Sequence, residues 1–217
     1  MKKYIYLSHF LSEDTPLYGG EKKINIKSAQ ALHNGDSSNS KMLCFPNHAG
    51  THVDFPRHFH DEGKTIKDYA PDYWLFNNPF LIRKRAKPNT IIDLNKEIRD
   101  LPRNIDFLII KTFFFKFRGK EPYWKYNPSL APQLASQLKN RCPDLKAIGF
   151  DFISLSGYQN RALGRVAHKE FLLNTDLLII EDMKLDELSQ SPIRVIGLPL
   201  LVEEIDGAPI TIIAEIE

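Results

Sequence analysis

Cysteine is scarce in this sequence, which has only Cys44 and Cys142 among its 217 residues. Two cysteines so far apart do not make a disulfide framework, and a reducing compartment is the simpler expectation. Long apolar runs are also missing. None approaches the roughly 20 residues of a membrane span, and the apolar residues after Lys2 and Lys3 end at Ser8, too soon for a secretory signal. We therefore expect a cytoplasmic protein without a membrane partner.

The sequence has no excess of one charge, since 29 basic residues stand against 27 acidic ones. The chain as a whole therefore lacks the basic footprint of nucleic-acid-binding proteins. Linkers, internal repeats and low-complexity tracts are absent as well. With 42% hydrophobic residues, the chain is long enough to bury one substantial core. These features predict a single domain spanning residues 1–217.

Histidine is concentrated in residues 47–61, NHAGTHVDFPRHFHD, which hold four of the seven histidines. Imidazoles and carboxylates are typical ligands of Zn²⁺ and Mn²⁺, and the glycine and proline here argue against a helix. In an extended chain His52 and Asp54 point the same way about 7 Å apart, whereas His48 lies roughly 13 Å from His52. A bend at Gly50 can bring His48 back. The segment predicts a bend, a short strand and a turn, with a metal site on His48, His52 and Asp54. The alternative is a surface loop that is merely rich in histidine.

The stretch HAGTHVDFPRH at residues 48–58 resembles the signature of the metal-dependent cyclase family, His-x-Gly-Thr-His-x-Asp-x-Pro-x-His, and matches all seven fixed positions. The best-known members of this family are bacterial kynurenine formamidases. Further metal ligands in the family are a histidine outside the signature and a glutamate about a dozen residues after it. His168 and Glu181 match this pattern. Glu181 stands out even without the family, because a carboxylate that ends the buried-type run LLII is costly unless it is paired or on a metal. Asp182 departs from the family, which commonly has asparagine there.

The resemblance implies a hydrolase that uses one or two Zn²⁺ or Mn²⁺ ions to cleave an amide-type C–N bond of a small, aromatic and anionic substrate. Such ions activate water and polarise a carbonyl group, so no serine or cysteine nucleophile is needed. His58 is then the candidate catalytic proton carrier, because imidazole exchanges protons near neutral pH, and the family assigns the matching histidine this role. N-formylkynurenine is the leading substrate, which implies tryptophan catabolism. The family also implies a homodimer or larger homo-oligomer.

Three alternatives stay open for the function. The protein could hydrolyse cyclic amides such as isatin, it could be a polyketide-type cyclase, or it could bind a metal and a small acid without catalysis.

Residues 111–126, KTFFFKFRGKEPYWKY, alternate aromatic and basic side chains. Such a segment could be a stacking platform for single-stranded nucleic acid, but no RNA-binding motif accompanies it. We favour a lid over the metal site, whose rings line a pocket for a flat substrate and whose cations bind its carboxylate.

Alternating strand-like and helical segments predict an α/β fold with a mixed sheet. Buried-type strands are expected at residues 106–110 and 147–150, and residues 33–40 predict a hairpin loop. The clearest helix covers residues 129–141, with Ser129 as its cap, and a short helix at residues 167–174 carries His168. Asp151, at the end of a strand, is interpreted as a structural carboxylate that binds loop amides. The resemblance implies the swivelling β/β/α sandwich of the family.

Overall fold

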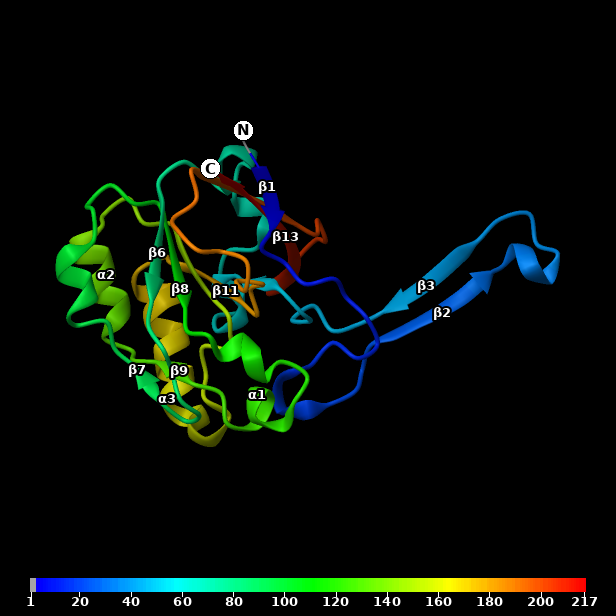
Figure 1. Cartoon of the computed structure of the whole chain (residues 1–217), viewed down its shortest axis with the longest axis horizontal. Helices are drawn as coiled ribbons and strands as arrows, with labels where there is room; N and C mark the ends of the chain where they lie inside the picture. Colours follow the sequence, from blue (N-terminus) through cyan, green and yellow to red (C-terminus); the bar gives the residue numbers. More distant parts are fainter. Residues whose placement is uncertain (1–2) are drawn as a thin grey trace.

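The computed structural model describes residues 3–217, and its main element is a nine-stranded sheet (Figure 1). The strands follow the order β5-β12-β13-β4-β11-β10-β8-β6, and β1 also pairs with β13. β6, β8, β10 and β11 are parallel, and the other pairings in this sheet are antiparallel. The predicted α/β fold with a mixed sheet is therefore confirmed. The nine strands are β1 (Lys3–Tyr6), β4 (His52–Asp54), β5 (Leu75–Phe76), β6 (Pro79–Arg83), β8 (Phe107–Lys111), β10 (Ala147–Phe150), β11 (Leu178–Glu181), β12 (Arg194–Pro199) and β13 (Gly207–Ile216).

The parallel strands form the centre of the core. Phe107, Leu108, Ile109 and Ile110 in β8 are all fully buried, as are the apolar residues of β11. Burying each large apolar side chain contributes roughly 1.5–3 kcal/mol, so a continuous apolar run is stable only where both faces of the strand are covered. The helices that cover this part of the sheet are α2 (Leu134–Arg141) and α3 (Arg161–Lys169), which lie on the side away from the β2–β3 hairpin (Figure 1).

Two helix boundaries differ from the sequence prediction. Ser129 does not cap a helix, because it lies in β9 (Ser129–Leu130), which pairs with β7 (Ile91–Ile92), and α2 begins only at Leu134. The helix that carries His168 begins earlier than predicted, at Arg161, where the Asn160 side chain accepts a hydrogen bond from the backbone of Leu163. A π-helical turn, Glu170–Asn174, follows it. Strand pairing outweighed the local helix signal at Ser129, whereas the local cap at Asn160 extends the second helix towards its N-terminus.

The remaining helical elements are short. They are α1 (Glu121–Lys125) and 3₁₀ turns at Tyr18–Gly20, Leu32–Asn34, Pro56–His58, Ile66–Asp68, Pro71–Trp74, Glu97–Asp100, Phe114–Phe117 and Tyr158–Asn160. None of the helices formed by residues 3–217 combines the length and the apolar character that crossing a membrane requires.

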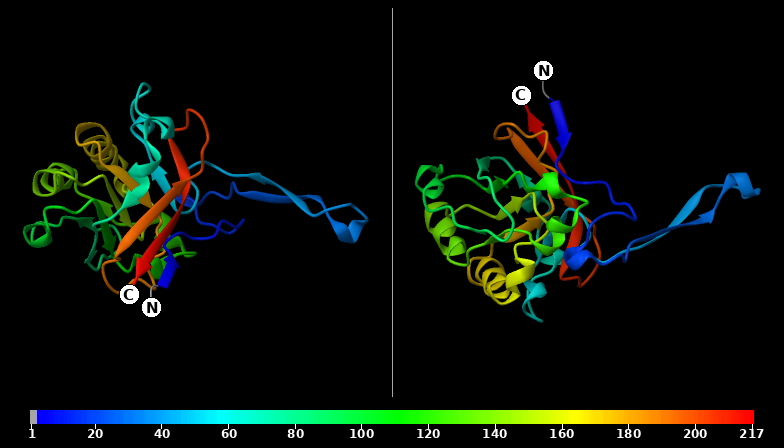
Figure 2. Two further views of the ribbon diagram at one scale, coloured as in Figure 1. Left: turned by 90° about the horizontal axis from the view of Figure 1, so that it is seen from above. Right: turned by 60° about the horizontal axis from the view of Figure 1, so that its bottom comes forward.

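The hairpin of β2 (Asn25–Gln30) and β3 (Ser40–Cys44) extends far from the rest of the molecule (Figure 2). Its connection contains the predicted hairpin loop at residues 33–40. Met42 and Leu43 on β3 are 66% and 57% exposed. An isolated two-stranded hairpin is marginally stable in water, so its exposed apolar side chains bear on the oligomeric state considered below.

Candidate metal centre and active site

The histidine-rich segment has the predicted bend, strand and turn. Gly50 has φ +63°, a left-handed conformation that favours glycine. The next residues form β4, and Pro56 begins the 3₁₀ turn that ends at His58. β4 lies between β13 and β11. Gly207 of β13 faces the His48 ring so closely that a β-carbon there would collide with it. The bend therefore places His48 over the end of β4, against a position that only glycine can occupy.

Strand pairing brings the two halves of the predicted ligand set together. In the antiparallel β4–β11 register Glu181 is the partner of His52, and α3 supplies His168. The His52 Nε2 atom lies 3.4 Å from Asp54 Oδ1 and 3.4 Å from Glu181 Oε2. The His168 Nε2 atom lies 3.5 Å from Asp54 Oδ2 and 3.6 Å from Glu181 Oε1. His48 Nδ1 lies 2.9 Å from Asp54 Oδ1. The five predicted residues thus lie close together. They form two groups of three possible ligand atoms, one from His48, His52 and Asp54 and one from Asp54, His168 and Glu181, and within each group the atoms lie within 4.8 Å of one another. Asp54 belongs to both groups.

Backbone carbonyls orient the two buried imidazoles. His52 Nδ1 donates to the carbonyl of Gly50 at 2.8 Å, and His168 Nδ1 donates to the carbonyl of Gly164 at 2.9 Å. Both rings therefore direct Nε2 towards the carboxylates, as metal-binding histidines typically do. Glu181 Oε1 accepts a hydrogen bond of 2.7 Å from the backbone of Leu155, which fixes that carboxylate as well.

The electrostatics of this cluster fit a divalent cation. Burial acts to lower the pKa of His48, but the charge of Asp54 and hydrogen bonds to Asp206 and Asp54 outweigh it and raise the pKa to about 10. Burial is likewise outweighed at His168, where hydrogen bonds to Asp54 and Glu181 raise the pKa to about 10. Two buried carboxylates demand nearby positive charge, and three imidazole nitrogens with two carboxylates are a suitable donor set for Zn²⁺ or Mn²⁺.

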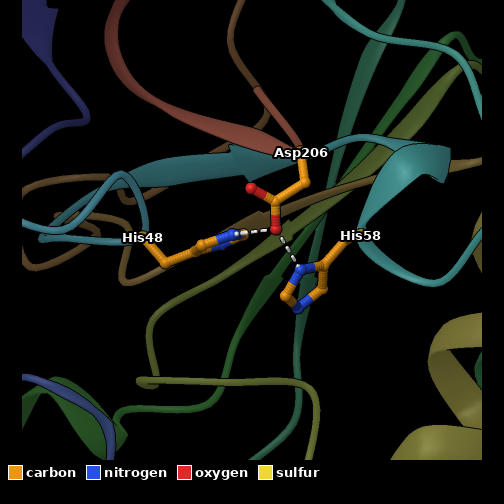
Figure 3. A group of neighbouring side chains, drawn as sticks. All are labelled: His48, His58 and Asp206. Carbon is orange, nitrogen blue, oxygen red and sulfur yellow. Dashed lines mark hydrogen bonds and ion pairs between the residues drawn. The ribbon is translucent and has the colours of Figure 1, made fainter. Parts of the chain in front are cut away.

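Asp206, which was not among the predicted site residues, joins this cluster (Figure 3). Its Oδ2 atom accepts hydrogen bonds from His58 Nδ1 at 2.6 Å and from His48 Nε2 at 2.9 Å, and its Oδ1 atom accepts one of 2.7 Å from the Asn47 side chain. The two imidazole hydrogen bonds hold the pKa of Asp206 well below its usual range. A carboxylate only accepts, so the hydrogens lie on His58 Nδ1 and His48 Nε2. His48 Nδ1 is thereby directed to the metal cluster, and His58 Nε2 is left without a bond to Asp206.

The only sequence signal at Asp206 is an Asp-Gly pair between two strand-like runs, which indicates a turn. Its partners depend on β13 pairing with β4, where Gly207 is the register partner of Asp54. Because that pairing joins residues about 150 positions apart, no local pattern could have revealed it.

Comparison with known proteins places the chain in a family, since residues 5–156 match the sequence model of the Cyclase family. The chain belongs to the Cyclase family. The prediction made from the HAGTHVDFPRH stretch is therefore confirmed.

Two relatives match nearly the whole chain. The kynurenine formamidase of Geobacillus thermodenitrificans is 28% identical over 210 residues, which cover 97% of this chain and 96% of that protein. Cyclase-like protein 2 of Oryza sativa is 23% identical over 219 residues, covering 96% and 78% of the two chains.

Solved structures share the fold. Isatin hydrolase A from Labrenzia aggregata has a TM-score of 0.82 at 17% identity, covering 99% of this chain and 94% of that one. A protein described as a potential metal-dependent hydrolase with cyclase activity has a TM-score of 0.79 at 20% identity, covering 100% and 99%. These likenesses agree with the predicted cyclase-type sandwich.

In this Cyclase family member, the five candidate metal ligands and His58 border a cavity of about 340 Å³. Its wall also contains Tyr18, Phe59, Arg161 and Arg165. Phe59 stacks on the His168 ring with 4.8 Å between centroids. His60, outside the signature, is exposed and does not line the cavity. Aromatic rings and two guanidinium groups thus surround the space next to the cluster.

The prediction that residues 111–126 form a lid over the metal site is wrong, because none of these residues lines the cavity. Arg118 instead donates two hydrogen bonds, of 3.0 and 2.8 Å, to the buried carboxylate of Asp182. The hydroxyl of Tyr123, which is fully buried, also donates to that carboxylate. Asp182 itself borders the cavity, so the segment supports the cavity wall from behind. Its arginine is committed to a protein carboxylate and is not free for a substrate.

Asp151 has the predicted structural role. Its Oδ1 atom accepts a hydrogen bond of 2.7 Å from the backbone of Thr112 and one of 2.5 Å from the Thr112 hydroxyl. Burial raises the pKa of Asp151 to about 6, although the hydrogen bonds from Thr112 oppose the rise. The carboxylate fastens the ends of β8 and β10 to each other and does not line the cavity.

Proposed function

We propose that this protein is a metal-dependent hydrolase that cleaves an amide-type C–N bond of a small, aromatic and anionic substrate, with N-formylkynurenine as the leading candidate. The observation that carries the proposal is the convergence of three histidines and two carboxylates beside His58 at one cavity. The His58 ring centroid lies 4.3 Å from that of His48 and 6.0 Å from that of His168. A substrate in the cavity can therefore contact the cluster and His58 together.

His48, His52 and Asp54 would hold one ion, and Asp54, His168 and Glu181 would hold a second. Zn²⁺ and Mn²⁺ both suit this mixture of imidazole and carboxylate ligands. A divalent cation bound here would supply an activated water and polarise the substrate carbonyl. With two ions bound, Asp54 would be shared between them, because it belongs to both groups of possible ligand atoms.

His58 is the proposed catalytic residue for proton transfer. Asp206 holds a hydrogen on Nδ1, so Nε2 is the nitrogen that can exchange a proton with the substrate. Cleavage of the C–N bond requires that the attacking water lose a proton and that the leaving amine gain one. His58 Nε2 takes up the first proton and returns a proton to the amine nitrogen. The imidazole suits both steps because the same nitrogen can accept a proton and then donate it.

The names of the relatives support an amide substrate. Matching proteins include kynurenine formamidases, and similar folds include isatin hydrolases. The first group favours a formamide and a place in tryptophan catabolism, and the second favours a cyclic amide as the alternative substrate. Polyketide-type cyclisation at the same site stays an alternative. All five proposed metal ligands are present, and a hydrogen bond from Nδ1 to Asp206 orients His58. Both features argue against a protein that binds a metal and a small acid without catalysis.

We also propose that the protein is a cytoplasmic homo-oligomer. Both cysteines are free, and Cys44 is exposed, which favours a reducing compartment. The β2–β3 hairpin has little contact with its own subunit in the views of Figure 2 and exposes Met42 and Leu43. Packing of the hairpin on a second copy would cover these side chains and stabilise the two strands.

Metal analysis followed by an activity assay tests the proposed function. Protein purified without added metal is analysed by mass spectrometry, and formate release from N-formylkynurenine is measured before chelation, after it, and after reloading with Zn²⁺ or Mn²⁺. We expect bound divalent metal and a formamidase activity that chelation abolishes and reloading restores. Metal without formamide cleavage would favour isatin-type substrates, whose hydrolysis is followed by the change in absorbance on ring opening, because it releases no formate. A protein that binds neither ion under any loading would refute the proposal.

A further inference from the structure

Two arginines on α3 face the cavity that holds the proposed catalytic cluster. Arg161 and Arg165 line it together with His168. These positions are four and three residues apart, so they form one stripe along the helix. With a rise of about 1.5 Å per residue, Arg165 lies about 4.5 Å and Arg161 about 10.5 Å from His168 along the axis. The stripe runs from the floor of the cavity, at His168, to its outer part.

Neither guanidinium is neutralised by the protein. Within residues 3–217, no carboxylate lies within ion-pair distance of Arg161 or Arg165. Like charges four residues apart destabilise a helix. Arg161 is also the first residue of α3, where the helix dipole disfavours a cation. These two charges thus oppose the stability of the helix, whereas Arg118 has a buried carboxylate partner.

The Arg161 side chain is held in place by aromatic rings. Its guanidinium carbon lies 4.1 Å from the centroid of the Tyr158 ring and 5.8 Å from that of Tyr18. The two tyrosine rings contact each other edge-on at 5.3 Å. Stacking fixes the plane of a guanidinium and leaves its N–H groups free at the edge. Such a fork is suited to a planar anion with two oxygens, which is a carboxylate.

We infer that Arg161 and Arg165 bind the carboxylate of the substrate and make the enzyme selective for amides that carry a carboxylate remote from the scissile bond. This inference rests on the proposed hydrolase function and specifies its substrate class. The carbonyl to be attacked lies at the His58 and His168 end, and the carboxylate lies one to two helical turns away. The separation also keeps the substrate anion away from the Asp54 and Glu181 carboxylates. N-formylkynurenine carries such a carboxylate, at the far end of the acyl side chain that is attached ortho to the formamide.

The kinetic test compares two substrates that differ only in that charge, N-formylkynurenine and its methyl ester, by formate release from metal-loaded enzyme. We expect wild-type kcat/KM to be higher for the acid. Arg161→Gln and Arg165→Gln should each lower kcat/KM for the acid at least about tenfold, mainly through KM, because a charge-assisted hydrogen bond is lost. The ester should be affected less than about twofold, and lysine at either position should restore part of the loss through its charge. An equal loss with both substrates, or no loss with the acid, would overturn the inference.

Lys169→Gln is the matched control, because Lys169 is an exposed cation on the same helix that does not line the cavity. It should leave the acid-to-ester ratio unchanged, and a change as large as that of the arginine variants would show that only net charge matters.

A binding measurement separates failure of the inference from failure of the proposed function. Kynurenine and kynurenine methyl ester are titrated into wild type and the Arg161→Gln/Arg165→Gln variant by calorimetry, which requires no turnover. We expect wild type to prefer the acid roughly tenfold or more and the double variant to lose this preference. A preference that persists in the double variant would mean that the carboxylate binds the metal cluster instead, and an absent preference in wild type would equally refute the arginine site. Suppose that neither formamide is cleaved, but that wild type prefers the acid and the double variant loses this preference. The proposed reaction would then be wrong, and the arginine site for the anion would be supported.

Discussion

His58 Nδ1 donates a hydrogen bond of 2.6 Å to Asp206 Oδ2, and this pair connects the signature histidine to a turn nearly 150 residues later in the chain. The same oxygen accepts from His48 Nε2. One carboxylate therefore sets the tautomer of the proposed proton carrier and of a proposed metal ligand. In this arrangement the two functions depend on each other, since a change at Asp206 alters both imidazoles.

Replacement of Asp206 should slow catalysis while leaving the fold intact. In Asp206→Asn the negative charge is lost and the new amide N–H groups face the Asn47 donor, so the hydrogen bonds that orient both imidazoles weaken. We expect kcat to fall roughly 10- to 100-fold, as for other groups that orient ligands, with a smaller change in KM. Steady-state kinetics with metal analysis of each sample measure the effect. Asp176→Asn removes an exposed carboxylate paired with Lys64 and is the matched control. A fully metal-loaded Asp206→Asn protein with wild-type kcat would contradict the positioning role.

His58 and Asp54 should separate proton transfer from metal binding. We expect His58→Ala to retain its metal and lose about 10²- to 10⁴-fold in kcat, the usual contribution of a general acid–base group. Asp54→Ala should lose both metal and activity, because Asp54 is shared by two triads of donor atoms. Metal content by mass spectrometry and formate release are the two measurements. Equal metal loss in the two variants would contradict this division of roles.

Removal of the metal should lower thermal stability. Ligands that bind only the folded state stabilise it by about 2.7 kcal/mol at a concentration a hundredfold above Kd, which corresponds to roughly 5–10 °C in Tm for a domain of this size. Thermal unfolding in the presence of chelator, of Zn²⁺ and of Mn²⁺ measures the shift. Asp54→Ala should show little response to either ion, and a wild-type Tm that is insensitive to chelation of bound metal would contradict the prediction.

Asp151 should make stability depend on pH in mildly acidic solution. Its folded-state pKa is raised by burial from 3.8 to about 6, so the folded state holds a proton that the unfolded state releases. The resulting stabilisation is fully present below pH 3.8 and is lost as the pH rises through about 6. At 1.36 kcal/mol per pKa unit the loss is on the order of 3 kcal/mol.

Asp151→Asn should therefore flatten the stability profile between about pH 4 and 6 and be more stable than wild type at pH 7. Urea unfolding of metal-free protein across this range measures it, with Asp100→Asn as the control at an exposed carboxylate. A variant whose profile has the wild-type slope would show that another group causes the dependence.

The β2–β3 hairpin should control the proposed assembly. Met42→Asp and Leu43→Asp place charges on its exposed apolar residues, and burial of an unpaired charge in an interface is strongly unfavourable. We expect both variants to shift towards monomer in light scattering coupled to size-exclusion chromatography. Lys41→Asp, on the same strand, changes charge without removing an apolar contact and serves as the control. A wild-type protein that is monomeric at all concentrations would refute the proposed oligomer.

Features that depend on neighbouring residues were predictable from the amino-acid sequence alone. The spacing of His48, His52 and Asp54 around a flexible Gly50 was enough to predict the bend and the short strand, and the family follows from the same stretch. The apolar run that ends in Glu181 was recognisable because a carboxylate at that point of a buried strand needs a partner. The mixed α/β sheet followed from alternating strand and helix patterns.

Contacts between side chains that are distant in the sequence depend on how the strands pair. Glu181 lies opposite His52 because β11 pairs with β4 in one register, and Asp206 reaches His58 because β13 pairs with β4 on its other side. The same packing places residues 111–126 behind the cavity, where Arg118 binds the buried Asp182 carboxylate. It leaves Arg161 and Arg165 facing the cavity with no carboxylate partner among residues 3–217. Periodicity and turn chemistry act over a few residues, whereas strand order and register are fixed by burial of the whole sheet, and a shift of one residue would turn every side chain to the other face.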